Sequence, residues 1–121
     1  MMDTQSADQA EVDVTNYLTP ADFVDSDHPA VVTFAQEAAA GCSEPLDQAL
    51  ALYLAVRDGV HYDPYYVGRE PHYYRASDCV ISGRGFCIGK ASLMAAAARA
   101  LGIPARVGCA DVRNHLSTEK L

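Results

Sequence analysis

An alanine-rich segment at residues 87–101, followed by glycine, isoleucine and proline, constrains the fold more than any other part of the chain. Good helix formers dominate it, and it has few polar interruptions: Lys90, Ser92 and Arg99. A rise of 1.5 Å per residue predicts a helix about 22 Å long, with Gly102 as its left-handed C-cap and Pro104 preventing its continuation. A helix this apolar is buried on most sides, so the rest of the chain must pack around it.

Shorter elements are expected around this helix. Pro29 suits a first helical position, and we expect Ser26 or Asp27 to cap the helix that begins there. A second helix is expected to follow Ser43 as its N-cap and to turn one apolar stripe toward the core: Leu46, Ala49, Leu50, Tyr53, Val56 and Val60. The remaining expected elements are a short helix at 76–81 and strands at 14–18 and 105–112.

Length and charge limit the class of protein. The chain has 121 residues, half of them apolar, which suits one small folded domain, with residues 1–13 as a flexible acidic tail and 14–121 as the folded part. The formal net charge is −7, which argues against nucleic acid or an anionic membrane as partner. Neither a signal peptide nor an apolar span is apparent, so we expect a cytoplasmic protein with reduced cysteines.

Residues 61–85 differ from the helices, since five of the seven tyrosines lie in what we call the tyrosine loop, residues 62–74. Its two prolines and one glycine preclude a long helix, so we expect an irregular connection there. Two interpretations stay open: the rings cover the core with their hydroxyls in water, or they line a cleft. Under the second interpretation, the candidate substrate-binding residues are Tyr62, Tyr65 and Tyr66.

Cys87 is the candidate catalytic residue, because it stands at the start of the alanine-rich helix, shortly after two glycines. The free N–H groups and the positive end of the helix dipole stabilise a thiolate there and lower its pKa. Arg84 and Lys90 would add to this effect if they lay close to the sulfur. The amide of Cys87 could also donate to an oxyanion during acyl transfer. A thiolate nucleophile further needs a histidine and a group that orients it.

The run from Gly85 to Arg106 resembles the nucleophile segment of the transglutaminase-like superfamily. It combines the cysteine, an alanine- and leucine-rich helix and the sequence Arg-Ala-Leu-Gly-Ile-Pro-Ala-Arg. Residues 52–63 are similar to the preceding helix of bacterial members, and the resemblance covers roughly residues 20–121. It implies an α+β, papain- and transglutaminase-like cysteine-proteinase fold. This chain would be its mainly helical N-terminal part, with the cysteine-bearing helix and the first strands of the sheet.

The resemblance implies acyl transfer on amide bonds through a thioester at Cys87, of the peptidase, amidase or transglutaminase type, with a protein or peptide substrate. Superfamily members carry a histidine and then an aspartate on strands after the cysteine. Here the residues after Cys87 include one histidine, His115, and the acid that follows it is Glu119. Neither fits the pattern, so we assign no catalytic histidine or aspartate. We expect the N-terminal part of a longer protein, inactive alone, whose strand edge at 105–112 invites self-association.

Two alternatives involve different chemistry. Zinc could be held by Cys79, Cys87, Cys109 and His115, but their spacing lacks the close cysteine pair typical of zinc sites. We therefore expect no metal and no cofactor. The other alternative is a non-catalytic protein- or ligand-binding module that retains the fold and uses the tyrosine loop as its contact surface. That module would carry an unreactive Cys87.

Overall fold

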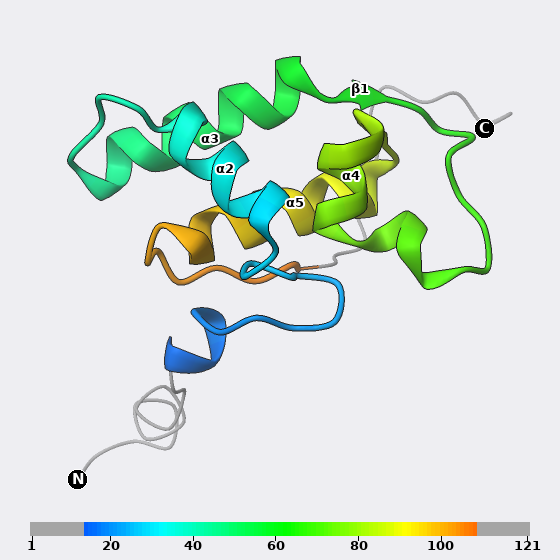
Figure 1. The fold of residues 1–121 in the computed structure, drawn as a ribbon, viewed down its shortest axis with the longest axis horizontal. Helices are drawn as coiled ribbons and strands as arrows, with labels where there is room; N and C mark the ends of the chain where they lie inside the picture. The colour runs from blue at the N-terminus through cyan, green and yellow to red at the C-terminus, as the bar shows by residue number, and fades with distance from the viewer. Residues whose placement is uncertain (1–13, 109–121) are drawn as a thin grey trace, which may run out of the picture.

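The computed structural model describes residues 14–108, and this part of the chain is mainly helical (Figure 1). Within these residues the α-helices are α2 (Pro29–Ala38), α3 (Pro45–Gly59), α4 (Ala76–Ser82) and α5 (Cys87–Ala100). They are joined by the 3₁₀ helices η1 (Val14–Tyr17) and η2 (Pro71–Tyr74) and by the strands β1 (His61–Tyr62) and β2 (Arg84–Gly85). This arrangement is consistent with the helical part of an α+β domain.

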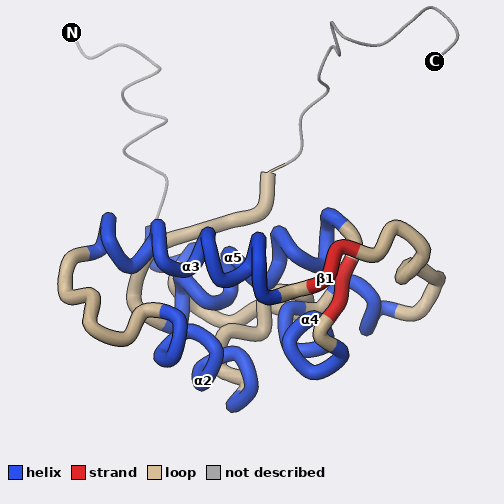
Figure 2. The backbone as a smooth tube through the Cα atoms, turned by 90° about the horizontal axis from the view of Figure 1, so that it is seen from above, coloured by secondary structure: helices blue, strands red, loops and turns tan. Residues whose placement is uncertain are grey.

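Helix α5 is the central element, because α2, α3 and α4 all pack against it. Figure 2 shows α3 along the upper side of the molecule, with α2 and α4 below it. Apart from Ser92, the buried residues of α5 are glycine, leucine and alanine: Gly89, Leu93 and Ala95 to Ala98. The predicted burial is thus confirmed, and so is the predicted left-handed glycine after the helix, since Gly102 has φ 82°.

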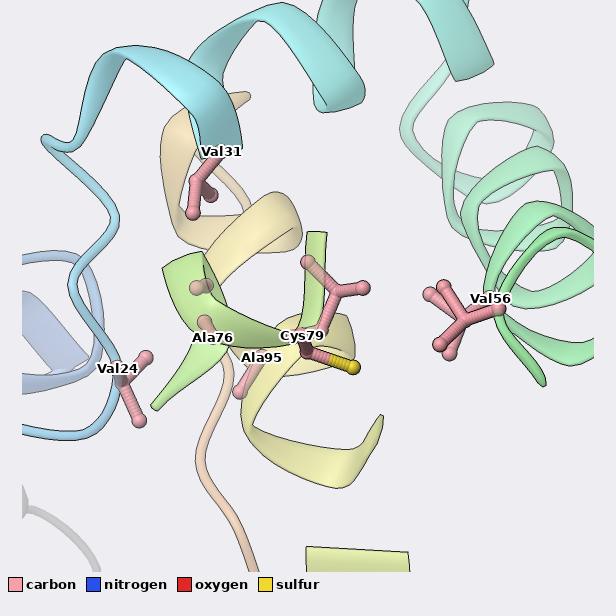
Figure 3. Close-up of a cluster of buried hydrophobic side chains, with 9 residues drawn as sticks. Val24, Val31, Val56, Ala76, Cys79 and Ala95 are labelled. Carbon is pink, nitrogen blue, oxygen red and sulfur yellow. The ribbon is translucent and has the colours of Figure 1, made fainter. Parts of the chain in front are cut away.

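The core consists of two clusters of side chains that α5 shares with its neighbours. The first cluster contains residues of all four α-helices. It is shown in Figure 3, where the labelled residues include Val31, Val56, Cys79 and Ala95. The second joins α2, α3 and the last turns of α5 through Ala35, Leu52, Ala97 and Ala98. Small side chains on α5 let the neighbouring backbones approach closely, so larger residues on the other helices become fully buried.

The start of α2 corrects one expectation and confirms another. Pro29 is the first helical residue, as expected, but the N-cap is His28 rather than Ser26 or Asp27. The His28 Nδ1 atom accepts a hydrogen bond from the backbone N–H of Ala30 at 3.1 Å. An imidazole nitrogen can satisfy a free helix N–H as a hydroxyl or carboxylate does. The expectation at α3 was also wrong, since its N-cap is Glu44, without a side-chain capping bond, and not Ser43.

The buried face of α3 differs in part from the predicted stripe. Val56 and Val60 are buried as expected, but Leu46 is 71% exposed, and Leu50 and Tyr53 are exposed as well. The packed face instead centres on Leu52 and Val56. Leucine and alanine occur on nearly every side of this helix, so its sequence pattern fixes the buried face poorly.

Both strand predictions need correction. Residues 14–17 form the 3₁₀ helix η1 rather than a strand. Residues 105–108 are not in a strand, and the rest of the predicted strand, 109–112, lies outside the described residues. The alternation that suggested a strand is still present in the burial, since Ala105 and Val107 are half-buried while Arg106 and Gly108 are exposed. Ala105 donates its N–H to the carbonyl oxygen of Tyr17 at 3.0 Å, which ties this segment to η1.

The strands that the structure does contain lie where an irregular connection was expected. Strands β1 and β2 are parallel, with His61 opposite Arg84 and Tyr62 opposite Gly85. The N–H of His61 donates to Gly83 and that of Asp63 to Gly85, each at 3.0 Å. This pair joins the end of α3 to the start of α5. The expected short helix is also present as α4, and Gly83 caps it with φ 74°.

The expected acidic tail, residues 1–13, lies outside the described residues. Among the helices that are described, none is both long and apolar enough to cross a membrane.

Candidate active site

Cys87 is the first residue of α5, and its side chain is exposed. The preceding residue, Phe86, is the N-cap and has extended backbone, and no side chain caps this helix end. The first N–H groups of an α-helix have no acceptor within the helix. The thiol therefore stands beside free N–H donors and the positive end of the helix dipole.

Two basic side chains near Cys87 have other partners. The Nζ atom of Lys90 donates to the carbonyl oxygens of Val60 at 2.9 Å and Arg57 at 3.4 Å, at the end of α3. Arg84 lies over the ring of Tyr66, 4.4 Å from its centroid, and 3.5 Å from a carboxylate oxygen of Asp63. The contacts of Lys90 and Arg84 therefore give no support to the expectation that these two residues stabilise a thiolate at Cys87.

Cys79 shows the opposite environment. Its side chain is 2% exposed within the first core cluster, and burial raises the pKa of its thiol to about 11. A Cβ atom built on Gly85 would lie 2.8 Å from the Cys79 sulfur, so this glycine is required for packing between β2 and α4. A Cβ on Gly89 would similarly lie 3.1 Å from the carbonyl oxygen of Tyr73. Both glycines thus seat the first turn of α5 against its neighbours.

The three candidate tyrosines lie in different surroundings. Tyr62 is half-exposed, and its ring centroid is 5.8 Å from that of Phe86, the residue before Cys87. Tyr65 is 89% exposed. Tyr66 is half-buried, and its hydroxyl donates to Asp78 at 2.7 Å. Tyr62 thus packs against the residue before Cys87, whereas Tyr66 belongs to the packing of the loop on α4.

A polar network that the sequence analysis did not identify holds the tyrosine loop to α4. Asp78 accepts from Tyr66 through one oxygen, and its other oxygen lies 3.3 Å from His72 Nδ1. The rings of His72 and Tyr73 have centroids 4.1 Å apart. Twelve residues separate Tyr66 from Asp78, so no local spacing rule would have indicated the pair.

Two apolar hollows flank the first turns of α5. One, of about 350 Å³, is lined by residues of α3, β1 and α5: Tyr53, Val56, Arg57, Tyr62, Lys90, Ala91 and Met94. The other, of about 380 Å³, is lined by Phe23, Val24, Tyr74, Ile88, Ser92 and Val107. A larger polar hollow of about 550 Å³, around Asp22, Asp25 and Arg75, has no α5 residue in its lining. Cys87 itself is in the lining of neither apolar hollow.

The described residues contain no group of three or more histidine, cysteine, aspartate or glutamate side chains that could hold a metal ion. Two members of the zinc set considered above, Cys109 and His115, lie outside residues 14–108. No hydrogen bond joins Cys87 to a histidine in the part of the chain that the structure describes.

Comparison with protein-family models matches residues 32–120 to the transglutaminase-like superfamily. The chain belongs to this superfamily. The match extends from within α2 past the end of α5, so it includes Cys87 and the expected nucleophile segment. The resemblance inferred from the sequence is thereby confirmed. No curated protein and no solved structure shows a significant match to this transglutaminase-like chain.

Proposed function

We propose that this chain supplies the nucleophile for cysteine-dependent acyl transfer at amide bonds, of the peptidase, amidase or transglutaminase type. The observation that carries the proposal is the exposed Cys87 at the first position of α5, in a chain of the transglutaminase-like superfamily. The helices described here would form the N-terminal part of a papain- and transglutaminase-like fold. A protein or peptide is the proposed substrate.

In the proposed reaction, the Cys87 thiolate attacks the carbonyl carbon of an amide and forms a carbon–sulfur bond. The carbonyl oxygen becomes an oxyanion, to which free N–H groups at the start of α5 would donate. The carbon–nitrogen bond then breaks, and the amine leaves with a proton from a general acid. Water or a second amine attacks the resulting thioester, which releases the acid or a new amide and restores the thiol.

The proton carrier for these steps is not assigned. Both ring nitrogens of His72 lie near carboxylates. Its Nδ1 atom is 3.3 Å from Asp78, and its Nε2 atom is 3.6 Å from Glu70. We therefore propose that this chain by itself forms the Cys87 thioester slowly and does not turn over amide substrates. Amidase or transamidase turnover by this chain, lost on Cys87→Ala, would show that the proton carrier lies within its 121 residues.

The proposed function is tested by the reactivity of the cysteines. With limiting iodoacetamide near pH 7, we expect Cys87 to be labelled before Cys42 and Cys79. Mass spectrometry of the digested protein gives the rate at each site, and Cys42→Ala is the control variant. Labelling of Cys87 at the same rate as Cys42, or more slowly, would contradict the proposal.

One observation favours the alternative, a non-catalytic binding module. Tyr65 projects from the tyrosine loop with 89% of its surface exposed, and tyrosine is common at protein interfaces. An unreactive Cys87, together with loss of partner binding on Tyr65→Ala, would favour the module over the enzyme.

A further inference from the structure

Helix α3 presents large apolar side chains to solvent along one of its faces. We call these four residues, each between 47% and 71% exposed, the α3 stripe: Leu46, Leu50, Tyr53 and Leu54. They share a face because they recur at intervals of three and four residues. Figure 1 shows α3 along one edge of the described fold, and α2 and α5 pack on its inner side. Apolar residues scattered singly on a surface are ordinary, but a contiguous group is typical of an interaction surface.

The two ends of the α3 stripe differ in charge. Glu44 and Asp47 are exposed at the start of the helix, and no lysine or arginine precedes Arg57 in the sequence. The other end carries Arg57 and Lys90 beside Asp58. Asp58 accepts from Arg57 at 2.8 and 3.0 Å, and the Lys90 Nζ atom donates to the carbonyl oxygen of Arg57 at 3.4 Å. The stripe is therefore negative at its amino end and, less strongly, positive at its carboxyl end.

This arrangement is complementary to itself when two α3 helices pair antiparallel. Asp47 and Arg57 each lie five residues from Leu52, about 7.5 Å along the axis at 1.5 Å per residue. A twofold axis level with Leu52 brings Asp47 of one copy level with Arg57 of the other, and it does so twice. The same rotation places the two α3 stripes face to face, with the residue spacing of a coiled-coil seam.

We propose that the α3 stripe is an interface between two copies of this chain, which pair antiparallel about a twofold axis. Such a dimer is closed, because both copies use the same patch. A contact limited to one 15-residue helix is small against the roughly 800 Å² that each partner buries in a standard interface, so the dimer is weak and depends on concentration. The inference goes beyond the proposed function and does not depend on it, since Cys87 is not part of the stripe.

Sedimentation equilibrium of the full chain tests the dimer. The mean mass should rise toward that of two chains as the concentration rises. Leu50→Glu should weaken dimerisation about tenfold or more, because its carboxylate would lose hydration in an apolar contact. Its circular dichroism should be unchanged, because Leu50 is already exposed. Ile81→Glu, at a position of α4 that is 69% exposed, is the matched control and should leave the dimer intact.

Charge reversal tests the antiparallel arrangement. Asp47→Arg or Arg57→Asp alone should weaken dimerisation about fivefold, because like charges would then face each other. The double variant should dimerise like the unsubstituted chain, because the two charges have exchanged places. Losses that add in the double variant would contradict the antiparallel pairing and with it the proposal.

Two further results would overturn the proposal. One is the mass of a single chain at every concentration up to about 1 mM. The other is a dimer that Leu50→Glu leaves unchanged, because its contact would then lie elsewhere, for example at the strand edge expected at 105–112. Either result leaves the proposed function standing, because that function is judged by iodoacetamide selectivity among the cysteines.

Discussion

Cys79 and Cys87 differ in chemistry because one side chain is enclosed and the other is not. Burial raises the pKa of Cys79 to about 11, so this thiol stays protonated at neutral pH, whereas Cys87 is exposed at the start of α5. The sequence indicated Cys87 through its position at the start of the alanine-rich helix. It could not rank the two thiols by burial, because burial depends on which helices pack around each sulfur.

Gly85 provides a test of the packing around Cys79. Gly85→Ala should lower the free energy of unfolding by about 1–3 kcal/mol, because the new Cβ would lie 2.8 Å from the sulfur. Urea denaturation measures the loss. Gly59→Ala is the control, since a Cβ there would meet nothing within 4 Å.

A double variant shows whether the contact is responsible. With Cys79→Ala as the second change, the Gly85 substitution should cost less than it does alone. Additive losses would mean that the strain lies elsewhere.

At the scale of elements, the sequence predicted the helices better than their contacts. The start of α5, the proline at the start of α2 and the left-handed Gly102 after α5 follow from local chemistry, and all are present. The buried face of α3 and the pairing of β1 with β2 depend on distant segments. The local sequence pattern therefore placed Leu46 and Leu50 in the core, where they do not lie, and it gave no indication that β1 pairs with β2.

Lys90 joins two elements, and its role can be separated from that of the thiol. Lys90→Met should lower the free energy of unfolding by roughly 1 kcal/mol, because the last carbonyls of α3 lose a donor. The rate of Cys87 alkylation should stay nearly constant, because the Lys90 ammonium is directed to α3. Arg69→Met, at an exposed arginine of the tyrosine loop, controls for the loss of charge. A large fall in Cys87 reactivity would assign Lys90 to the thiolate instead.

At the scale of the whole molecule, the candidate site assembles from segments that are far apart in the sequence. The apolar hollow of about 380 Å³ beside α5 is lined by Phe23, Tyr74, Ser92 and Val107 among others, although no two of these four are close neighbours along the chain. Sequence reasoning located the candidate nucleophile, Cys87, from a short motif. It could not locate the hollow, because its walls form only when α5 is surrounded by the other segments.

The tyrosine loop offers a test of how firmly these segments are held together. Burial, and secondarily the hydrogen bond to Asp78, raises the pKa of the Tyr66 phenol above its ordinary value. In Tyr66→Phe this bond is lost, and amide hydrogen exchange at residues 66–74 should become about fivefold faster. Tyr65→Phe, at the exposed neighbouring ring, is the matched control and should leave exchange unchanged. Equal exchange in both variants would show that packing alone holds the loop.

The pairing of β1 with β2 has a consequence for how such a protein can diversify. The two strands close the intervening segment at its base, so the distance between its ends is set independently of its length. Doubling a flexible loop costs only about 0.6 kcal/mol in closure entropy. New sequence between Pro64 and Arg69 would therefore be tolerated with little change to α5 and its thiol. Selection could then alter the surface beside Cys87 while the helical scaffold stays constant.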